Sequence, residues 1–112
     1  MEIKPLSPHE LECATIEESL LRNRKIKNCL IELINDKLDK FFRKNSHTSP
    51  CVFVIDLSVY EVVHGCIDMN TFSFLCKDVA NLYRENGWNV YDEKRMTETE
   101  LYHYFDFNIK QH

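Results

Sequence analysis

The fold of this chain is decided by the stretch Ile16–Lys44, IEESLLRNRKIKNCLIELINDKLDKFFRK, which contains neither Gly nor Pro. At the angular spacing of an α-helix its apolar side chains gather on one broad side, opposite a narrow polar strip. The apolar set comprises Ile26, Leu30, Leu33, Ile34, Leu38, Phe41 and Phe42, with Cys29 and Ile31 at its margins. We therefore predict an amphipathic helix that other parts of the chain, or a partner, largely cover.

This predicted helix is longer than the domain is wide. At about 1.5 Å per residue it is roughly 40 Å long, which exceeds the width of a domain of this size. One end is expected to project, and projecting apolar surface requires a second subunit. We predict a homodimer joined through this helix, at Leu30 and Leu38, through the edge of a strand at 51–57, or through both. The alternative is a monomer in which residues 1–15 and 59–69 fold back over the helix.

The composition indicates one domain in a reducing compartment. The chain has 112 residues, enough for a core that needs no metal or disulfide. Its five cysteines are odd in number and form no closely spaced pair, which is typical of buried reduced thiols; they are Cys13, Cys29, Cys51, Cys66 and Cys76. No apolar run has the length of a membrane span, and the start lacks a signal-peptide pattern. We expect a soluble cytoplasmic protein without cofactor or bound metal.

The charge distribution bears on nucleic-acid binding. The formal net charge is −4, yet residues 22–44 hold eight Lys or Arg against three acids. A phosphate-binding surface needs basic residues on one face, whereas these scatter around the helix. We therefore interpret them as a solvated rim rather than a phosphate-binding stripe.

The N-terminal region predicts two helices. Ser7 suits an N-cap, Pro8 the first helical position and Glu10 the third residue of a capping box, so a first helix begins here. The apolar pattern weakens near Ala14 or Thr15, and the acids that follow suit a second N-terminus. We expect a break at that point, and an end to the long helix before Pro50.

Five further segments follow. Cys51–Leu57 is rich in β-branched residues and apolar on both alternating faces, so we predict a strand covered on both sides. Residues 59–64 suit either a strand or a short helix or turn, the latter slightly favoured. A helix is expected at about 71–86, capped by Asn70 or Thr71 and stopped by Gly87. Strands at 88–91 and 101–107 flank a hairpin loop, Asp92–Glu100.

This order of elements predicts an α+β domain with two N-terminal helices and a small three-stranded sheet at about 51–57, 88–91 and 101–107. The strand order stays open. Because a hairpin joins the last two strands, 51–57 lies at an edge unless it separates them. If it lies at an edge, another subunit would complete that edge.

The segment Leu82–Tyr91, LYRENGWNVY, followed by Tyr102–Phe105, YHYF, resembles a recurrent class of small bacteriophage proteins. Those proteins share a Ser-capped first helix, a long charged second helix, a strand, a helix ending in Gly-aromatic-x-Val and a closing aromatic strand. The likeness lies in layout rather than identity, and residues 59–69 are an insertion. It implies an accessory or virion-associated role and carries over no catalytic residue.

The residues that could support catalysis form no recognisable site. His64, Cys66 and Cys76 supply three metal ligands where a structural zinc site needs four, and Cys76 falls within a helical pattern. His103 alternates with apolar residues, which indicates a core histidine bonded to the backbone. With only two glycines there is no phosphate-cradling loop. We predict a protein without enzymatic activity.

Aromatic residues of the hairpin suggest a binding platform. Tyr91, Tyr102 and Tyr104, with Trp88 across the hairpin, can cover a helix, stack bases or anchor a protein. Nearby acids repel phosphates, which favours protein over nucleic acid; they are Asp92, Glu93, Glu98, Glu100 and Asp106. The sequence therefore predicts a protein-interaction module. The alternatives are a nucleic-acid-binding accessory protein that uses the basic helix and the tyrosines, and an acidic inhibitor that mimics DNA.

Overall fold

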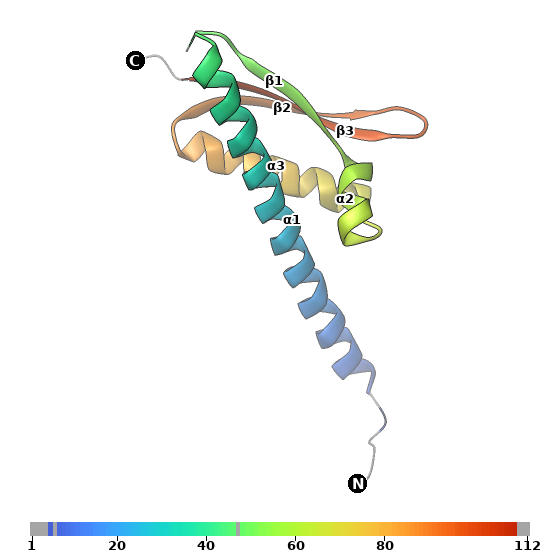
Figure 1. The fold of residues 1–112 in the computed structure, drawn as a ribbon. Helices are drawn as coiled ribbons and strands as arrows, with labels where there is room; N and C mark the ends of the chain where they lie inside the picture. Colours follow the sequence, from blue (N-terminus) through green and yellow to red (C-terminus); the bar gives the residue numbers. More distant parts are fainter. Residues whose placement is uncertain (1–4, 6, 47, 110–112) are drawn as a thin grey trace.

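The structure, a computed structural model, describes Pro5, residues 7–46 and residues 48–109, without the side chains of residues 10–14. Within this part the elements are α1 (Pro8–Lys44), β1 (Cys51–Asp56), α2 (Leu57–His64), α3 (Met69–Glu85), β2 (Trp88–Met96) and β3 (Leu101–Ile109). The strands form one antiparallel sheet in the order β1-β3-β2. The helices lie on one side of it (Figure 1), which confirms the predicted α+β class.

The N-terminal region is one continuous helix of 37 residues, so the predicted break near Ala14 or Thr15 is wrong. The helix begins at Pro8, as expected, but no Gly or Pro follows to interrupt it. Glu has a high helix propensity, so acids inside a helix do not mark a second start. The role expected of the Glu10 side chain lies outside the described side chains.

One end of α1 projects from the body (Figure 1), as its length predicted. The molecule measures 66 × 33 × 19 Å along its principal axes. Within the body α1 buries a residue every fourth position, from Ile26 through Leu30 and Ile34 to Leu38. Toward its N-terminus Leu20 is 63% exposed. The projecting end therefore carries apolar residues that the described part of the chain does not cover.

The core fills the space between the sheet and the helices. β3 is the central strand and presents its odd-numbered residues, among them Phe105 and Phe107, to the helices, as predicted. The rings of Phe53 on β1 and Phe107 stack with centroids 5.7 Å apart, and Tyr83 of α3 meets Phe107 edge-on. These contacts fix the sheet against α3 and give it a single buried face.

β1 lies at an edge of the sheet, and the interpretation that it is covered on both sides is wrong. Cys51 and Ile55 are buried, whereas Val52 and Val54 are about half exposed, at 48% and 50%. No helix of the described part lies on that outer side of the sheet (Figure 1). The continuous apolar pattern of β1 therefore reflects one buried face and one bare apolar face.

Local polar contacts set the remaining boundaries. β2 continues to Met96, so the loop is shorter than predicted, because pairing with β3 outweighs the polar composition of residues 92–96. Residues 59–64, which suited either a strand or a short helix or turn, belong to the helix α2. Asp56 caps this helix, and its carboxylate accepts a hydrogen bond from the Ser58 N–H at 2.9 Å. Asp68, rather than Asn70 or Thr71, caps α3 in the same way. Gly87 follows α3 with a φ of 96°, where glycine is favoured.

Candidate functional surfaces

The outer face of the sheet carries the three tyrosines predicted to make contacts. Tyr102 and Tyr104 of β3 point away from the helices, as does Tyr91 of β2. The rings of Tyr91 and Tyr104 meet edge to face with centroids 6.1 Å apart. The Arg95 guanidinium lies 4.2 Å above the centre of the Tyr104 ring. Since Val54 pairs with Tyr104 across β1 and β3, the aromatic cluster adjoins an exposed valine.

Trp88 is not part of this cluster. It lies on the opposite side of the sheet, with ring centroids 5.6 Å from Phe42 of α1 and 5.9 Å from Phe107. The reason is the alternation of β2, in which Trp88 and Val90 point toward the helices and Tyr91 points away. The predicted platform therefore consists of tyrosines and Arg95, without the tryptophan.

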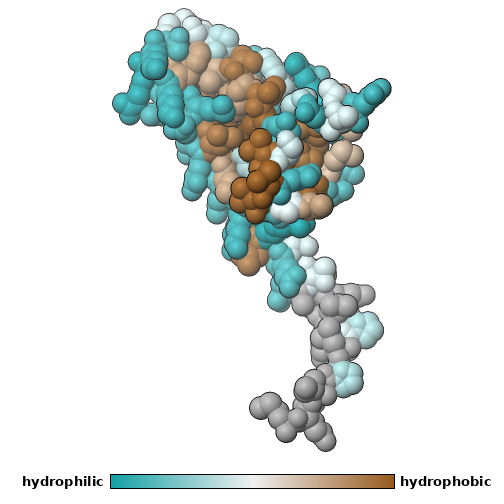
Figure 2. Space-filling model, turned by 45° about the vertical axis from the view of Figure 1, so that its right-hand side comes forward, coloured by the Kyte–Doolittle hydropathy of each residue, from teal (hydrophilic) through white to brown (hydrophobic). Residues whose placement is uncertain are grey.

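Exposed valines are concentrated in β1 and α2. Buried residues alternate with them at the spacing of a strand in β1 and of a helix in α2, so each of these elements has one inner and one outer side. Figure 2 shows hydrophobic residues gathered on the body, above a projecting part that is largely hydrophilic or grey. The exposed valines are Val52, Val54, Val59, Val62 and Val63, with exposures from 48% to 87%. An apolar surface of this kind is typical of a protein-binding site.

The leucines predicted as dimer contacts lie in the core and not on the surface. Leu30 is fully buried and Leu38 nearly so, both within the core of the chain itself. The sequence could not separate them from surface residues, because a helical stripe looks the same whether a sheet or a partner covers it. Among the described side chains of α1, the large apolar residues that are exposed are instead Ile16, Leu20 and Leu21.

A network of three polar side chains connects β2, β3 and α3, and two of them, Asp92 and His103, are buried. The Nε2 atom of His103 lies 2.8 Å from one carboxylate oxygen of Asp92, and the Arg84 guanidinium lies 2.5 Å from the other. Arg84 also donates from Nε to the Val90 carbonyl oxygen at 3.0 Å. His103 is thus a core residue, as predicted, but its partner is a carboxylate rather than the backbone.

Burial of its side chains limits the reactions that this network could catalyse. His103 is 1% exposed, and its Nδ1 atom has no hydrogen-bond partner in the described part of the chain. Burial lowers the pKa of His103, although the hydrogen bond and charge of Asp92 act in the opposite direction. Burial also raises the pKa of the Cys76 thiol, with a further contribution from the charge of Asp92. Because a substrate cannot reach His103, Asp92 or Cys76, we interpret the network as structural.

The cysteines and histidines considered as metal ligands are dispersed. Cys76 is buried in α3, Cys66 is exposed, and His64 lies half-buried at the end of α2 against Tyr60. Within the described residues no three His, Cys, Asp or Glu side chains group in a way that could hold a metal ion. The thiols of Cys29, Cys51, Cys66 and Cys76 are free.

Many basic side chains of α1 already interact within the chain. Such contacts reduce their availability for phosphate groups and argue against a nucleic-acid-binding stripe. Lys27 pairs with Asp78, Lys40 with Asp36 and Arg43 with Asp39, Lys37 lies 5.3 Å from the centre of the Phe53 ring, and Arg22 donates to the Cys66 carbonyl. These partners support the interpretation of the basic residues as a solvated rim.

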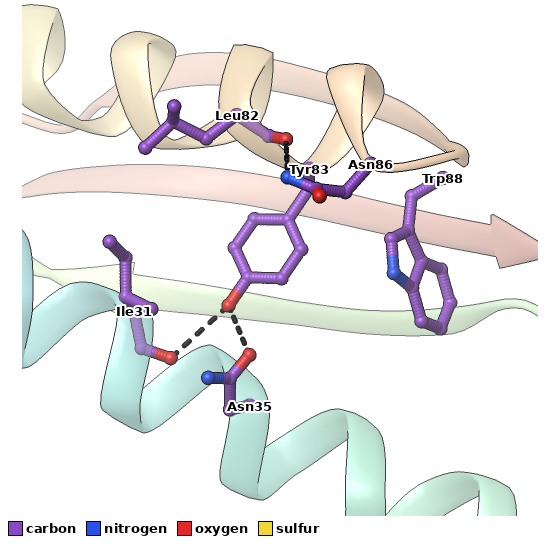
Figure 3. A pocket seen from close by; sticks show the side chains of 6 residues that line it. All are labelled: Ile31, Asn35, Leu82, Tyr83, Asn86 and Trp88. Carbon is purple, nitrogen blue, oxygen red and sulfur yellow. Dashed lines mark hydrogen bonds between the residues drawn. The ribbon is translucent and has the colours of Figure 1, made fainter.

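Two pockets beside α1 share Trp88 as a lining residue. Figure 3 shows the first, about 400 Å³, where Tyr83 of α3 points toward Ile31 and Asn35 of α1. The second, about 320 Å³, is lined by Leu38 and Phe42 of α1. The Tyr83 hydroxyl lies 3.2 Å from the Ile31 carbonyl oxygen and 2.5 Å from the Asn35 side-chain oxygen. With a single proton, it can donate to only one of these acceptors at a time.

Comparisons with known proteins leave the family open. No protein-family model matches this chain, and searches of curated proteins and of solved structures gave no match. None of the helices in the described part has both the length and the hydrophobicity needed to cross a membrane. The function is therefore argued from the surfaces alone.

The sequence reasoning missed two features of these surfaces. Asp92 was assigned to a polar loop, yet extending the alternation of Trp88 and Val90 by one step would have placed it on the core side. Val62 and Val63 were treated only as a secondary-structure ambiguity. Their spacing from Val59 would have indicated one apolar face of a short helix.

Proposed function

We propose that this chain is a non-enzymatic protein-interaction module that binds a partner protein through the outer face of its sheet and the exposed valines of α2. The observation that carries the proposal is the run of five valines, from Val52 to Val63, that faces solvent. Fully burying one valine side chain contributes about 1.5–3 kcal/mol, so several can support binding. The neighbouring tyrosines and Arg95 belong to the residue types that dominate protein interfaces.

The charges on the same face favour a protein over a nucleic acid. Asp106 pairs with Val52 on one side and Tyr91 on the other, and Glu93 pairs with Tyr104. These carboxylates stand beside the tyrosines and would repel a phosphate backbone. An acidic DNA mimic is also disfavoured, because apolar valines and not carboxylates dominate β1 and α2.

The class of partner follows from the layout of the chain, which resembles that of small bacteriophage accessory proteins. That resemblance favours a host protein of the cytoplasm, or a component of an assembling particle, as the partner. One feature of it, a separate first helix, is absent from the described part of this chain.

A capture experiment with matched variants tests this proposal. The chain is immobilised and exposed to a cytoplasmic lysate, and each retained protein is purified and its affinity measured. Wild type and Glu85→Lys, an exposed control on α3, should bind with equal affinity. Val54→Lys and Val62→Lys should weaken binding at least tenfold, because each places a charge in an apolar contact.

Two results would contradict the proposal. The first is a partner that binds all four proteins equally. The second is nucleic-acid binding near micromolar affinity at physiological salt that charge reversal at Arg24 and Lys25 weakens, which would favour the nucleic-acid alternative.

A further inference from the structure

The two edge strands of the sheet differ in how they are protected. β2 carries charged residues in succession from Asp92 to Arg95. The Arg84 guanidinium also donates from Nε to the carbonyl oxygen of Val90 in this strand, at 3.0 Å. Charged side chains are a common means by which an edge strand avoids pairing with another chain. β2 is therefore protected against the addition of a further strand.

β1 has no such protection. Residues 51–55 contain no charged side chain, no Pro and no Gly, and they are hydrogen-bonded to β3 on one side only. Within the described residues, no other group forms a hydrogen bond with their backbone. Because the N–H and C=O groups of a strand point alternately to its two sides, every second residue directs both groups away from β3. We call this side of the strand the open edge of β1.

A cation lies beside the open edge, on the helix side of the sheet. The Nζ atom of Lys37 lies 5.3 Å from the centre of the Phe53 ring. Among the described residues, no carboxylate forms an ion pair with Lys37. Lys44 follows on the same side of α1 at helical spacing, and Lys40, between them, pairs with Asp36. The flank of α1 that adjoins β1 is therefore basic.

We propose that the open edge of β1 pairs with an extended segment of the partner protein, in which apolar side chains alternate with carboxylates. The backbone of this segment supplies the missing hydrogen-bond partners and adds a strand to the sheet. Its apolar side chains lie beside Val52 and Val54 on the outer face. Its carboxylates lie on the helix side, beside Phe53 and within reach of Lys37.

A second copy of this chain suits the open edge less well. Residues directly opposite each other in a sheet lie on the same face. Two copies that keep their exposed valines together therefore pair around Phe53, with Val52 of one chain opposite Val54 of the other. This arrangement brings both Lys37 side chains to the same side of the joined edges, where the two cations repel each other. A partner strand with carboxylates on that side replaces the repulsion by an attraction.

This inference rests on the proposed function, because it names the part of the partner that meets β1. It explains the half-exposed Val52 and Val54 as neighbours of an added strand. The exposed valines of α2 stay available for another part of the same partner.

Synthetic peptides and the full chain labelled with ¹⁵N test the pairing. The probe is a capped heptapeptide in which Val alternates with Glu. One control peptide has Lys in place of Glu, and the other places all Val before all Glu. NMR measures amide hydrogen exchange in the chain. The probe should slow the exchange of every second β1 amide about tenfold and leave the amides of β2 unchanged, whereas both controls should bind more weakly.

A charge exchange tests the position of the carboxylates. Lys37→Glu should weaken binding of the Glu peptide about fivefold and strengthen binding of the Lys peptide by a similar factor. Lys25→Glu makes the same change of charge at an exposed residue of α1 that β1 does not contact, and it should change neither affinity. Equal effects of the two substitutions would contradict the position assigned to the carboxylates.

Other results would overturn the pairing itself. One is a Glu peptide that protects no β1 amide at millimolar concentration, and another is equal affinity for all three peptides. If the β1 amides become protected in the chain alone while its mass by light scattering doubles, a second copy occupies the open edge. A captured partner that depends on Val54 and Val62 but leaves the β1 amides unprotected would support the proposed function and contradict the added strand.

Discussion

His103 and Asp92 are hydrogen-bonded through Nε2 and Oδ2 at 2.8 Å, although both side chains are almost completely buried. A carboxylate only accepts, so Nε2 of His103 carries the proton of this bond. Asp92 is balanced by Arg84, which leaves His103 as the neutral member of the network. Protonation at Nδ1 would create a buried N–H group without an acceptor in the described part of the chain.

The free energy of unfolding should therefore fall as the pH falls below about 6.5. His103 titrates near its ordinary value of 6.5 in the unfolded chain, and its folded pKa is lower, chiefly because of burial. Below 6.5 the unfolded state binds a proton that the folded state does not, whereas above it both are neutral. Urea midpoints measured from neutral to mildly acidic pH check this. His103→Gln, which keeps a donor toward Asp92, should show a smaller decline, and equal declines would contradict the assignment.

Neighbouring acids on β2 should differ sharply in their contribution to stability. Asp92→Ala should cost about 2–4 kcal/mol, because it leaves Arg84 and His103 without their shared acceptor. Glu93→Ala is the matched control, since Glu93 makes an exposed ion pair with Arg95 and should change stability by about 0.5 kcal/mol or less. Denaturant unfolding at neutral pH measures both, and similar losses would show that the network contributes little.

Leu30 and Leu20 of α1 should differ in their contribution to stability, because Leu30 lies in the core and Leu20 on the projecting end of the helix. Leu30→Ala should destabilise the chain by about 3–5 kcal/mol, because Leu30 is fully buried and its removal leaves a cavity. Leu20→Ala should cost about 0.5 kcal/mol or less, because Leu20 is 63% exposed. A large loss for Leu20→Ala would mean that the projecting end of α1 packs against the body of the same chain.

The Tyr83 hydroxyl links α3 to α1. Tyr83→Phe should cost about 0.5–1.5 kcal/mol, because it removes the hydrogen bond to Ile31 or Asn35 while keeping the buried ring. Burial raises the pKa of the Tyr83 hydroxyl to about 12, so this group stays protonated at neutral pH. Tyr91→Phe, at an exposed ring on the outer sheet face, is the control and should be neutral. Equal thermal midpoints for the two variants would argue against the link.

Local periodicity was sufficient to predict most of the elements. The apolar stripe of α1 and the alternation of β3 depend only on residue spacing, so the helix, the strand and the core side of His103 were all predictable. The same spacing placed Tyr102 and Tyr104 on one face. The break wrongly predicted near Ala14 lies in a short stretch that contains no Gly or Pro. There the end of a helix had to be judged from the helix propensity of a few residues alone.

The sequence by itself determined the class of the fold, the central stripe of α1 and the side of β3 on which each residue lies, because these follow from the geometry of a single element. Only the tertiary structure decided what covers each face. It buried Leu30 and Leu38 within the chain, left Val52 and Val54 bare, and turned Asp92 inward to His103 and Arg84. Burial depends on residues that are distant in the sequence. An apolar face therefore has the same sequence pattern whether a sheet packs on it, a partner binds to it or it stays exposed to water.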